Sequence, residues 1–240
     1  MTAYSYDVER IDKRIVSFLE AQTPVMAADA RATHVGTRSY LYGVSNAACR
    51  GILNSVSQDI NLLGREGQIA LLDLLAGGTS HEEKSMVGFL LKMRPGLRAH
   101  LPPPILRRWI SAFDGWAQID ALCQNVFTAE EMLTDWPGWN ALLDELSRST
   151  DERDQRAGLV LLVGPVRRVR DPGLVARAET SLRRALEFDG SLVQRAVSWL
   201  LREMVRRYAH EVERFLQLHE SEMPGFVVRE VSDKFTRSAL

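Results

Sequence analysis

Trp116 and Asp120 stand four residues apart in the stretch FDGWAQID, directly after an Asp-Gly pair that is typical of a helix start. On a helix this spacing places the indole and the carboxylate on one face, with Asp114 as the expected N-cap. The face of an indole attracts cations, and a carboxylate carries a full negative charge. The pair therefore suits a positively charged group, although a tryptophan anchored in the core beside a solvated aspartate would give the same pattern.

Arg153 and Arg156 fall in the first turn of a helix expected over residues 152–165. Cations at a helix N-terminus oppose the helix dipole, at a cost of about 0.3–1 kcal/mol each. A nearby anion would relieve this cost. The anion could be a bound phosphate, or it could be a local carboxylate, either Glu152 or Asp154.

Four residues of the stretch SLVQRAVSWLLREMVRR share one face of a predicted helix: Arg195, Trp199, Arg202 and Arg206. The opposite face is apolar enough to dock the helix, with Val193, Val197, Leu200, Leu201 and Met204. Arginines around one indole suit phosphates and bases. A partly buried Trp199 with arginine stems lying beside it is the alternative.

The charge of the chain is balanced overall but uneven along its length. The formal net charge is -1, yet the segment from Arg153 to Arg214 holds 13 arginines and eight acidic residues. Of the basic residues of the whole chain, 26 are arginine and four are lysine. Guanidinium groups suit phosphate because they meet two oxygens at once, but a genome that favours arginine on solvated faces would give the same composition.

Helical periodicity dominates the sequence, and strand-like alternation is absent. We expect helices over 6–21, 44–57, 66–76, 80–92, 103–112, 115–127, 137–148, 152–165, 172–187, 191–207, 209–219 and 225–236. They are separated by short Gly, Pro and Asp-Gly breakers, so one continuous domain over 1–240 is expected. Helices that arrive in pairs roughly every 35–45 residues predict an all-α, HEAT-like helical-repeat solenoid with a concave surface for an extended ligand. An irregular helical bundle is the alternative.

Several protein classes are excluded by composition and spacing. No apolar run reaches the roughly 18 residues of a membrane span, and the first residues lack the apolar segment of a signal peptide, so we expect a cytoplasmic protein. Two cysteines cannot form a disulfide scaffold, and the five histidines show no zinc spacing. We therefore expect no metal and no cofactor.

Several stretches resemble, in order along the chain, the DNA alkylation repair family of HEAT-like-repeat DNA glycosylases. The resemblance covers about residues 35–235, and it is carried by YLYGVSNAACRGIL (40–53), TSHEEKSMVGFLL (79–91), GWAQIDALC (115–123), DQRAGLVLL (154–162) and QRAVSWLLREMVRRYAHEV (194–212). The last stretch is the most specific.

The resemblance implies an active site made of four residues. Trp116 and Asp120 match the family's catalytic tryptophan and aspartate, Arg156 matches its active-site arginine, and Trp199 matches its second active-site tryptophan. It also implies that the partner is double-stranded DNA with alkylated bases, and that no deep base-flipping pocket is used. We expect the protein to act as a monomer.

The expected phosphate contacts are the arginines of the two predicted inner helices, namely Arg153, Arg195, Arg202 and Arg206, with Arg156 beside them. The chain also departs from the family pattern. Arg153 stands where a tryptophan is common, Ser191-Leu192 where aromatic residues are common, and Ser45-Asn46-Ala47 where a Gln-Thr-Pro-like sequence is frequent. The near-neutral charge is lower than is usual in the family.

The chemistry that the resemblance implies follows from the charge of the lesion. A purine alkylated at N3 or N7 is already cationic, so it leaves without a general acid. The protein then needs to stabilise oxocarbenium character on the sugar, either by the charge of Asp120 or by orienting the attacking water. The tryptophans would contact the lesion and its sugar.

The first hypothesis is therefore a monofunctional DNA glycosylase that excises N3- and N7-alkylated purines in base excision repair. Two alternatives remain open at this point. One is a non-catalytic HEAT-repeat protein that binds distorted or branched DNA, and the other is a helical scaffold for another protein.

Overall fold

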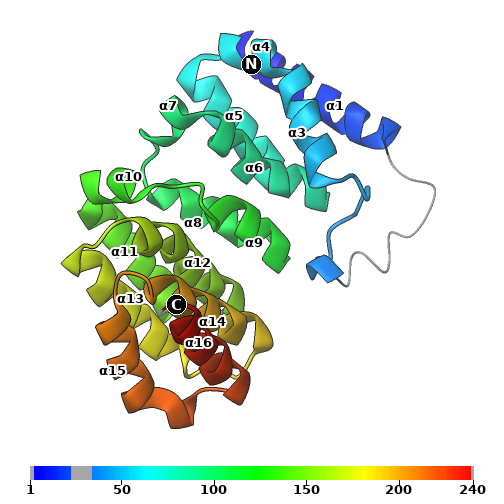
Figure 1. The fold of residues 1–240 in the computed structure, drawn as a ribbon. Coiled ribbons are helices and arrows are strands. Elements are labelled where there is room, and N and C mark those ends of the chain that lie inside the picture. Colours follow the sequence, from blue (N-terminus) through cyan, green and yellow to red (C-terminus); the bar gives the residue numbers. More distant parts are fainter. Residues whose placement is uncertain (1–2, 23–33, 239–240) are drawn as a thin grey trace. The chain divides into compact units, whose positions relative to one another are not determined.

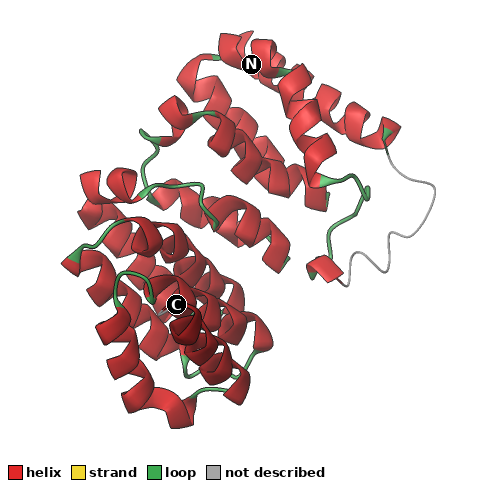
Figure 2. Cartoon of the chain, viewed as in Figure 1, coloured by secondary structure: helices red, strands yellow, loops and turns green. Residues whose placement is uncertain are grey.

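The computed structural model describes residues 3–22 and 34–238. These residues form helices joined by short loops, and the only pairing of strand type among them is a single bridge between Tyr40 and Ser80 (Figures 1 and 2). The all-α fold class predicted from the sequence is confirmed.

The chain divides into two compact units. Unit 1 comprises Met1–Leu101 and Arg108–Leu122, and unit 2 comprises Pro102–Arg107 and Cys123–Leu240. The boundary falls within helix α8 (Pro104–Ala112) and at the end of helix α9 (Trp116–Cys123). The expectation of one domain over 1–240 stays a prediction.

Unit 1 is built on amphipathic helices, namely α1 (Ala3–Ala21), α3 (Asn46–Ser55), α4 (Ser57–Leu62), α5 (Gly64–Gly77), α6 (His81–Met93) and α7 (Pro95–Arg98). Helix α1 shows why they pack. Its Val8, Ile11, Ile15 and Leu19 recur at helical spacing and are all buried. Helices α1, α3 and α6 each pack against a neighbour in this unit, with α5 between α1 and α6.

Helix α6 is unusual because its first turns are polar and buried at once. Glu82 is 2% exposed, and its carboxylate accepts hydrogen bonds from the backbone N–H groups of Tyr42, Gly43 and Val44 at 3.1, 2.8 and 3.1 Å. Glu83 completes a capping box with Ser80. Burying a charge is costly unless it is hydrogen-bonded. Because the loop before α3 supplies the donors to Glu82, these bonds hold the loop in one conformation.

Unit 2 contains α10 (Ala129–Thr134), α11 (Trp136–Arg148), α12 (Glu152–Arg168), α13 (Pro172–Ala185), α14 (Ser191–Met204), α15 (Ala209–His219), a 3₁₀ turn η1 (Glu220–Glu222) and α16 (Gly225–Ser238). Helix α12 is central: residues 157–163 are all buried, and it packs against α10, α11, α13 and α14. A helical segment that is apolar on all sides, as residues 157–163 are, needs such a covered position.

The sequence QRA occurs near the start of both α12 and α14, and its glutamine has the same role each time. The Nε2 group of Gln155 donates to the carbonyl oxygens of Ser147 and Ser149, both at 2.8 Å. Likewise, Nε2 of Gln194 donates to the carbonyl oxygens of Ala185 and Phe188 at 3.2 and 2.6 Å. Each glutamine therefore ties a helix to the end of the preceding one, as expected of successive helical hairpins.

All twelve predicted helices are present, with small shifts at their ends. The expected helix 115–127 ends at Cys123, because Asn125 adopts a φ of 54° that a continuing helix does not allow. Helix α12 runs past Pro165 to Arg168, three residues beyond the expected end. The short helices α4, α7 and α10 are not among the predicted ones.

None of the helices in the described part of the chain has the length and apolar character needed to cross a membrane.

Candidate active site

Trp116 and Asp120 lie on the half-buried side of α9, in unit 1. Both side chains are partly exposed, whereas Ile119 and Leu122 on the other side of the helix are fully buried. The i, i+4 spacing therefore orients the indole and the carboxylate toward the same side. The indole and the carboxylate are therefore both accessible in part from this side of α9.

The indole of Trp116 packs against a segment that sequence reasoning missed. The ring of His34 lies edge-on to it, with ring centroids 6.4 Å apart and an interplanar angle of 80°. Gly36 has a φ of 65°, and a Cβ placed there would lie 2.6 Å from Cδ1 of Trp116. Only glycine fits this backbone conformation and this close approach, so residues 34–36 form one wall beside the indole.

Asp114 holds that segment in place instead of capping α9. Its carboxylate accepts hydrogen bonds from Thr37 Oγ1 at 2.8 Å, from the backbone N–H of Arg38 at 2.8 Å and from Ser39 Oγ at 3.0 Å. The side chain of Gln118 also donates to it at 3.0 Å, while Oε1 of Gln118 accepts from the backbone N–H groups of Asp114 and Gly115. The expected N-cap role is therefore replaced by a long-range one.

The charge of Asp114 is strongly stabilised. Burial raises the pKa of its carboxyl, but the hydrogen bonds from Thr37, Arg38, Gln118 and Ser39 outweigh burial and hold the pKa at about 2. The ammonium group of Lys84 lies 3.8 Å from the same carboxylate. The network therefore stays intact at all pH values near neutrality.

Helix α6 supports α9 by direct backbone contact. A Cβ built on Gly88 would lie 1.9 Å from the carbonyl oxygen of Ala121, so no larger residue is compatible with this crossing. Because Ala121 follows Asp120 directly, Gly88 sets the position of the turn that carries the candidate carboxylate.

In unit 2, Arg156 is 6% exposed and is engaged by the protein itself. Its Nη1 donates to the carbonyl oxygen of Leu192 at 2.8 Å, which ties the first turns of α12 to the start of α14. A side chain this buried is a poor phosphate contact. The expectation that Arg156 holds a DNA phosphate is not favoured by its surroundings.

Arg153 is paired with the residue that caps its own helix. Its guanidinium contacts the carboxylate of Asp151, with Nε 3.0 and 3.1 Å from the two oxygens, and the same carboxylate accepts from the backbone N–H of Arg153. Hydrogen bonds from Arg153 hold the pKa of Asp151 below its usual value. The charge at the start of α12 is thus relieved by a local carboxylate, although Asp151 and not Glu152 or Asp154 provides it.

The predicted face of α14 is present in part. The apolar residues expected on the opposite face are all buried. Arg195 is exposed and Trp199 is half-buried, but Arg202 lies 3.7 Å from the carboxylate of Glu230 on α16 and so shares its charge with an acid. Helix α14 ends at Met204, so Arg206 is exposed in the turn beyond it and is not on the helix.

These elements match a known family. The family model described as DNA alkylation repair enzyme matches residues 17–235. The chain belongs to this family. Among curated proteins, none matches it.

A solved structure supports the same fold for this member of the DNA alkylation repair enzyme family. It is described as a predicted DNA alkylation repair enzyme from Enterococcus faecalis, and it superposes with a TM-score of 0.69 at 12% sequence identity, covering 85% of this chain and 92% of that chain. At this identity the likeness concerns the fold, and it confirms the helical-repeat class.

The four residues that the resemblance implied for the active site divide evenly between the units of this DNA alkylation repair protein. Trp116 and Asp120 belong to unit 1, and Arg156 and Trp199 belong to unit 2. Two contacts in the structure do not follow from the residue pattern. In unit 1, residues 34–36 pack against Trp116, and in unit 2, Arg156 donates a hydrogen bond to the carbonyl oxygen of Leu192.

The cysteines and the possible metal ligands among the described residues do not add a second reactive site. Cys49 and Cys123 are buried, and burial raises the pKa of the Cys49 thiol to about 12, which disfavours the nucleophilic thiolate. No group of three His, Cys, Asp or Glu side chains in the described part of the chain could hold a metal ion.

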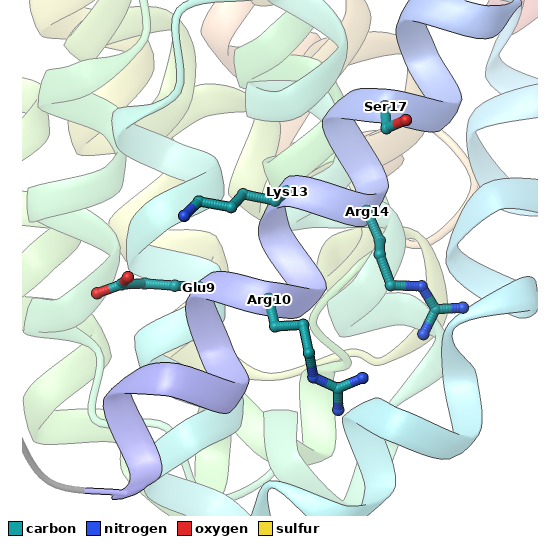
Figure 3. A pocket seen from close by; sticks show the side chains of 5 residues that line it. All are labelled: Glu9, Arg10, Lys13, Arg14 and Ser17. Atoms are coloured by element: carbon teal, nitrogen blue, oxygen red, sulfur yellow. The ribbon is translucent and has the colours of Figure 1, made fainter.

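A hollow of about 300 Å³ lies along α1, and its described lining consists of Glu9, Arg10, Lys13, Arg14 and Ser17 (Figure 3). Arg14 forms an ion pair with Asp59, and Arg10 lies 3.8 Å from the same residue. Two of its three cations are therefore neutralised within the protein, and none of the residues predicted for chemistry lines it.

Proposed function

We propose that this chain is a monofunctional DNA glycosylase that hydrolyses the N-glycosidic bond of cationic N3- or N7-alkylated purines in duplex DNA. The observation that carries the proposal is that the side chains of Trp116 and Asp120 are both partly exposed on one side of α9. This helix contacts Gly88 through its backbone, and residues 34–36 form a wall beside the indole. Membership of the DNA alkylation repair enzyme family supports the choice of alkylated DNA as the proposed substrate.

In this proposal Asp120 supplies negative charge where the sugar becomes positive. The alkylated purine departs with the electron pair of its glycosidic bond, the sugar takes on oxocarbenium character, and water adds to the anomeric carbon with loss of a proton. A carboxylate stabilises that charge best when it is partly withdrawn from solvent and held in place. The half-buried position of Asp120 on α9 meets this requirement.

Trp116 and Trp199 are proposed to contact the cationic base and its sugar through their rings. Both are partly exposed, so each can present a ring surface. Arg156 is proposed as a positioning residue, because its bond to the carbonyl of Leu192 fixes the start of the helix that carries Trp199.

The DNA backbone is proposed to contact exposed arginines of unit 2. Arg195 and Arg206 are exposed and suit phosphate oxygens. Arg153 and Arg202 share their charge with Asp151 and Glu230, so their contribution to DNA affinity is expected to be smaller.

The test is base release from duplex DNA treated with a methylating agent. The proposal predicts free 3-methyladenine or 7-methylguanine in solution, with abasic sites left in the DNA and no strand cleavage until alkali is added. Untreated duplex of the same sequence should yield neither product. Salt-dependent binding to methylated or branched DNA without any base release would instead support the non-catalytic DNA-binding alternative.

A further inference from the structure

Residues Arg38 to Tyr42 form an extended segment whose side chains alternate between solvent and core. Leu41 is 6% exposed, whereas Tyr40 is 57% exposed and Arg38 is also exposed. In an extended segment alternate residues point to the same side, so Arg38, Tyr40 and Tyr42 share the outward side.

The two tyrosines form one aromatic unit. Their ring centroids are 4.8 Å apart, and the rings are nearly perpendicular at 83°. Tyr40 is the most exposed aromatic residue among the large apolar side chains that are exposed in the described part of the chain. Exposed aromatic surface of this kind is typical of binding sites, because it offers large, flat contact area with little side-chain entropy to lose.

The backbone that presents this pair is fixed on both sides. The N–H of Tyr40 donates to the carbonyl of Thr79 at 3.1 Å, and its own carbonyl accepts from the N–H of His81 at 2.8 Å. The carboxylate of Glu82 accepts from the backbone N–H groups of Tyr42, Gly43 and Val44, which follow. The carboxylate of Asp114 accepts from the backbone N–H of Arg38 and from the hydroxyl of Ser39, which precede. A loop fixed in this way loses little entropy on binding.

The charges around the pair define what it can accept. Burial raises the pKa of the Tyr42 phenol, and the carboxylates of Glu83, Glu20 and Glu82 raise it further, so Tyr42 sits in a negative field. That field disfavours a phosphate beside Tyr42 but not a neutral or cationic ring. Arg38, on the far side of Tyr40, is where a phosphate would be stabilised.

We propose that Arg38, Tyr40 and Tyr42 form a stacking platform for an unpaired nucleobase of bound DNA, with Arg38 contacting the adjoining phosphate. The inference rests on the proposed function in taking DNA as the partner. The platform belongs to the same unit as Trp116, and the carboxylate of Asp114 connects the two through Arg38 and Ser39. It is a separate contact, because none of its residues takes part in the proposed bond cleavage.

The experiment uses the full chain and a duplex that carries 2-aminopurine opposite a tetrahydrofuran abasic analogue, so that the fluorescent base has no partner. Wild type should quench the fluorescence by stacking. Tyr40→Leu should remove most of the quenching and weaken affinity for this duplex about tenfold, because one base–aromatic stack is lost. Tyr40→Phe should behave like wild type, since it keeps the ring.

Two comparisons make the result specific. Leu62→Ala, which removes another exposed apolar side chain of unit 1, should leave quenching unchanged. Affinity for the fully paired duplex should be the same in wild type and Tyr40→Leu. Tyr40→Leu is preferred to a change at half-buried Tyr42, and its thermal unfolding should match that of wild type.

The proposal is overturned if wild type does not quench, if Tyr40→Leu quenches as wild type does, or if it loses equal affinity for the paired duplex. The DNA contains no alkylated base, so the readout does not depend on base release. A protein that releases no methylated purine but shows Tyr40-dependent quenching would contradict the glycosylase proposal alone, and the opposite pattern would contradict the platform alone.

Discussion

Asp120 and Asp12 are two carboxylates of unit 1 whose surroundings differ. Asp120 lies half-exposed on α9, where its charge can act on a ligand. Asp12 lies on α1 with its Oδ1 atom buried and without a hydrogen-bond partner. Burial and the nearby Glu83 raise its pKa from 3.8 to about 6, against a smaller lowering by Lys13. Its charge is therefore a cost to the fold at neutral pH.

Replacing Asp12 by Asn should stabilise the protein at neutral pH. The folded state binds more protons than the unfolded state between pH 3.8 and about 6, so wild-type stability falls as the pH rises through this window. Because the group is partly exposed, solvent screening leaves a gain of about 1 kcal/mol for Asp12→Asn at neutral pH, and none below the window.

Urea unfolding at about pH 7.5 and about pH 4 measures this difference. The exposed Asp7→Asn serves as the control, with a change within about 0.5 kcal/mol at both pH values. A gain for Asp12→Asn that is equal at both pH values would contradict the assigned pKa.

Residue types and spacing point to some residues of the candidate site and miss others for one reason. Trp116, Asp120 and Trp199 stood out because their environment on a helix face follows from local spacing. The wall at His34 and Gly36, the long-range bonds of Asp114 and the burial of Arg156 depend on segments far apart in the chain. No local pattern reports such contacts.

At the scale of elements, long amphipathic helices were predictable and short ones were not. Helix α7 begins at Pro95, because proline is favoured in the first turn of a helix although it interrupts a helix elsewhere. Helix α10 begins with a capping box from Thr128 to Glu131, a local start signal that does not depend on apolar periodicity. Helix α4 begins with neither a proline nor a capping box.

The position of α9 against α6 depends on Gly88. Gly88→Ala should destabilise the protein by about 1–3 kcal/mol, because its Cβ would overlap the carbonyl oxygen of Ala121 and force α6 and α9 apart. Base release should fall together with stability, since the turn that carries Asp120 shifts.

Gly51→Ala is the matched control for this change. Gly51 is also inside a helix, but nothing lies within 4 Å of its Cβ position. The same substitution there should stabilise the protein by about 0.5–1 kcal/mol through helix propensity. Thermal or urea unfolding of the two variants measures both effects, and equal effects at the two sites would contradict the close crossing of α6 and α9.

For the whole molecule, the balance of charge sets how DNA is held. The chain is near neutral, so we expect its affinity for DNA to come from a few exposed arginines and not from a general basic surface. Exposed arginines should therefore contribute more to DNA affinity than arginines that are already paired with acids.

Arg195→Ala should reduce the slope of log K against log salt concentration for duplex binding by about 1, because one phosphate contact is lost. Arg202→Ala should reduce it by clearly less, since Arg202 already shares its charge with Glu230. Fluorescence anisotropy over a salt series measures both slopes. A larger loss in Arg202→Ala than in Arg195→Ala would contradict the assignment of phosphate contacts.

The most direct measurement is the rate of 3-methyladenine and 7-methylguanine release from methylated duplex DNA by wild type, Asp120→Asn and the exposed control Asp233→Asn. We predict that Asp120→Asn loses about 10²-fold or more in rate while it still binds DNA, because the charge proposed to stabilise the sugar is removed. Asp233→Asn should match wild type. Equal rates for Asp120→Asn and wild type would contradict the proposed role of Asp120 in breaking the glycosidic bond.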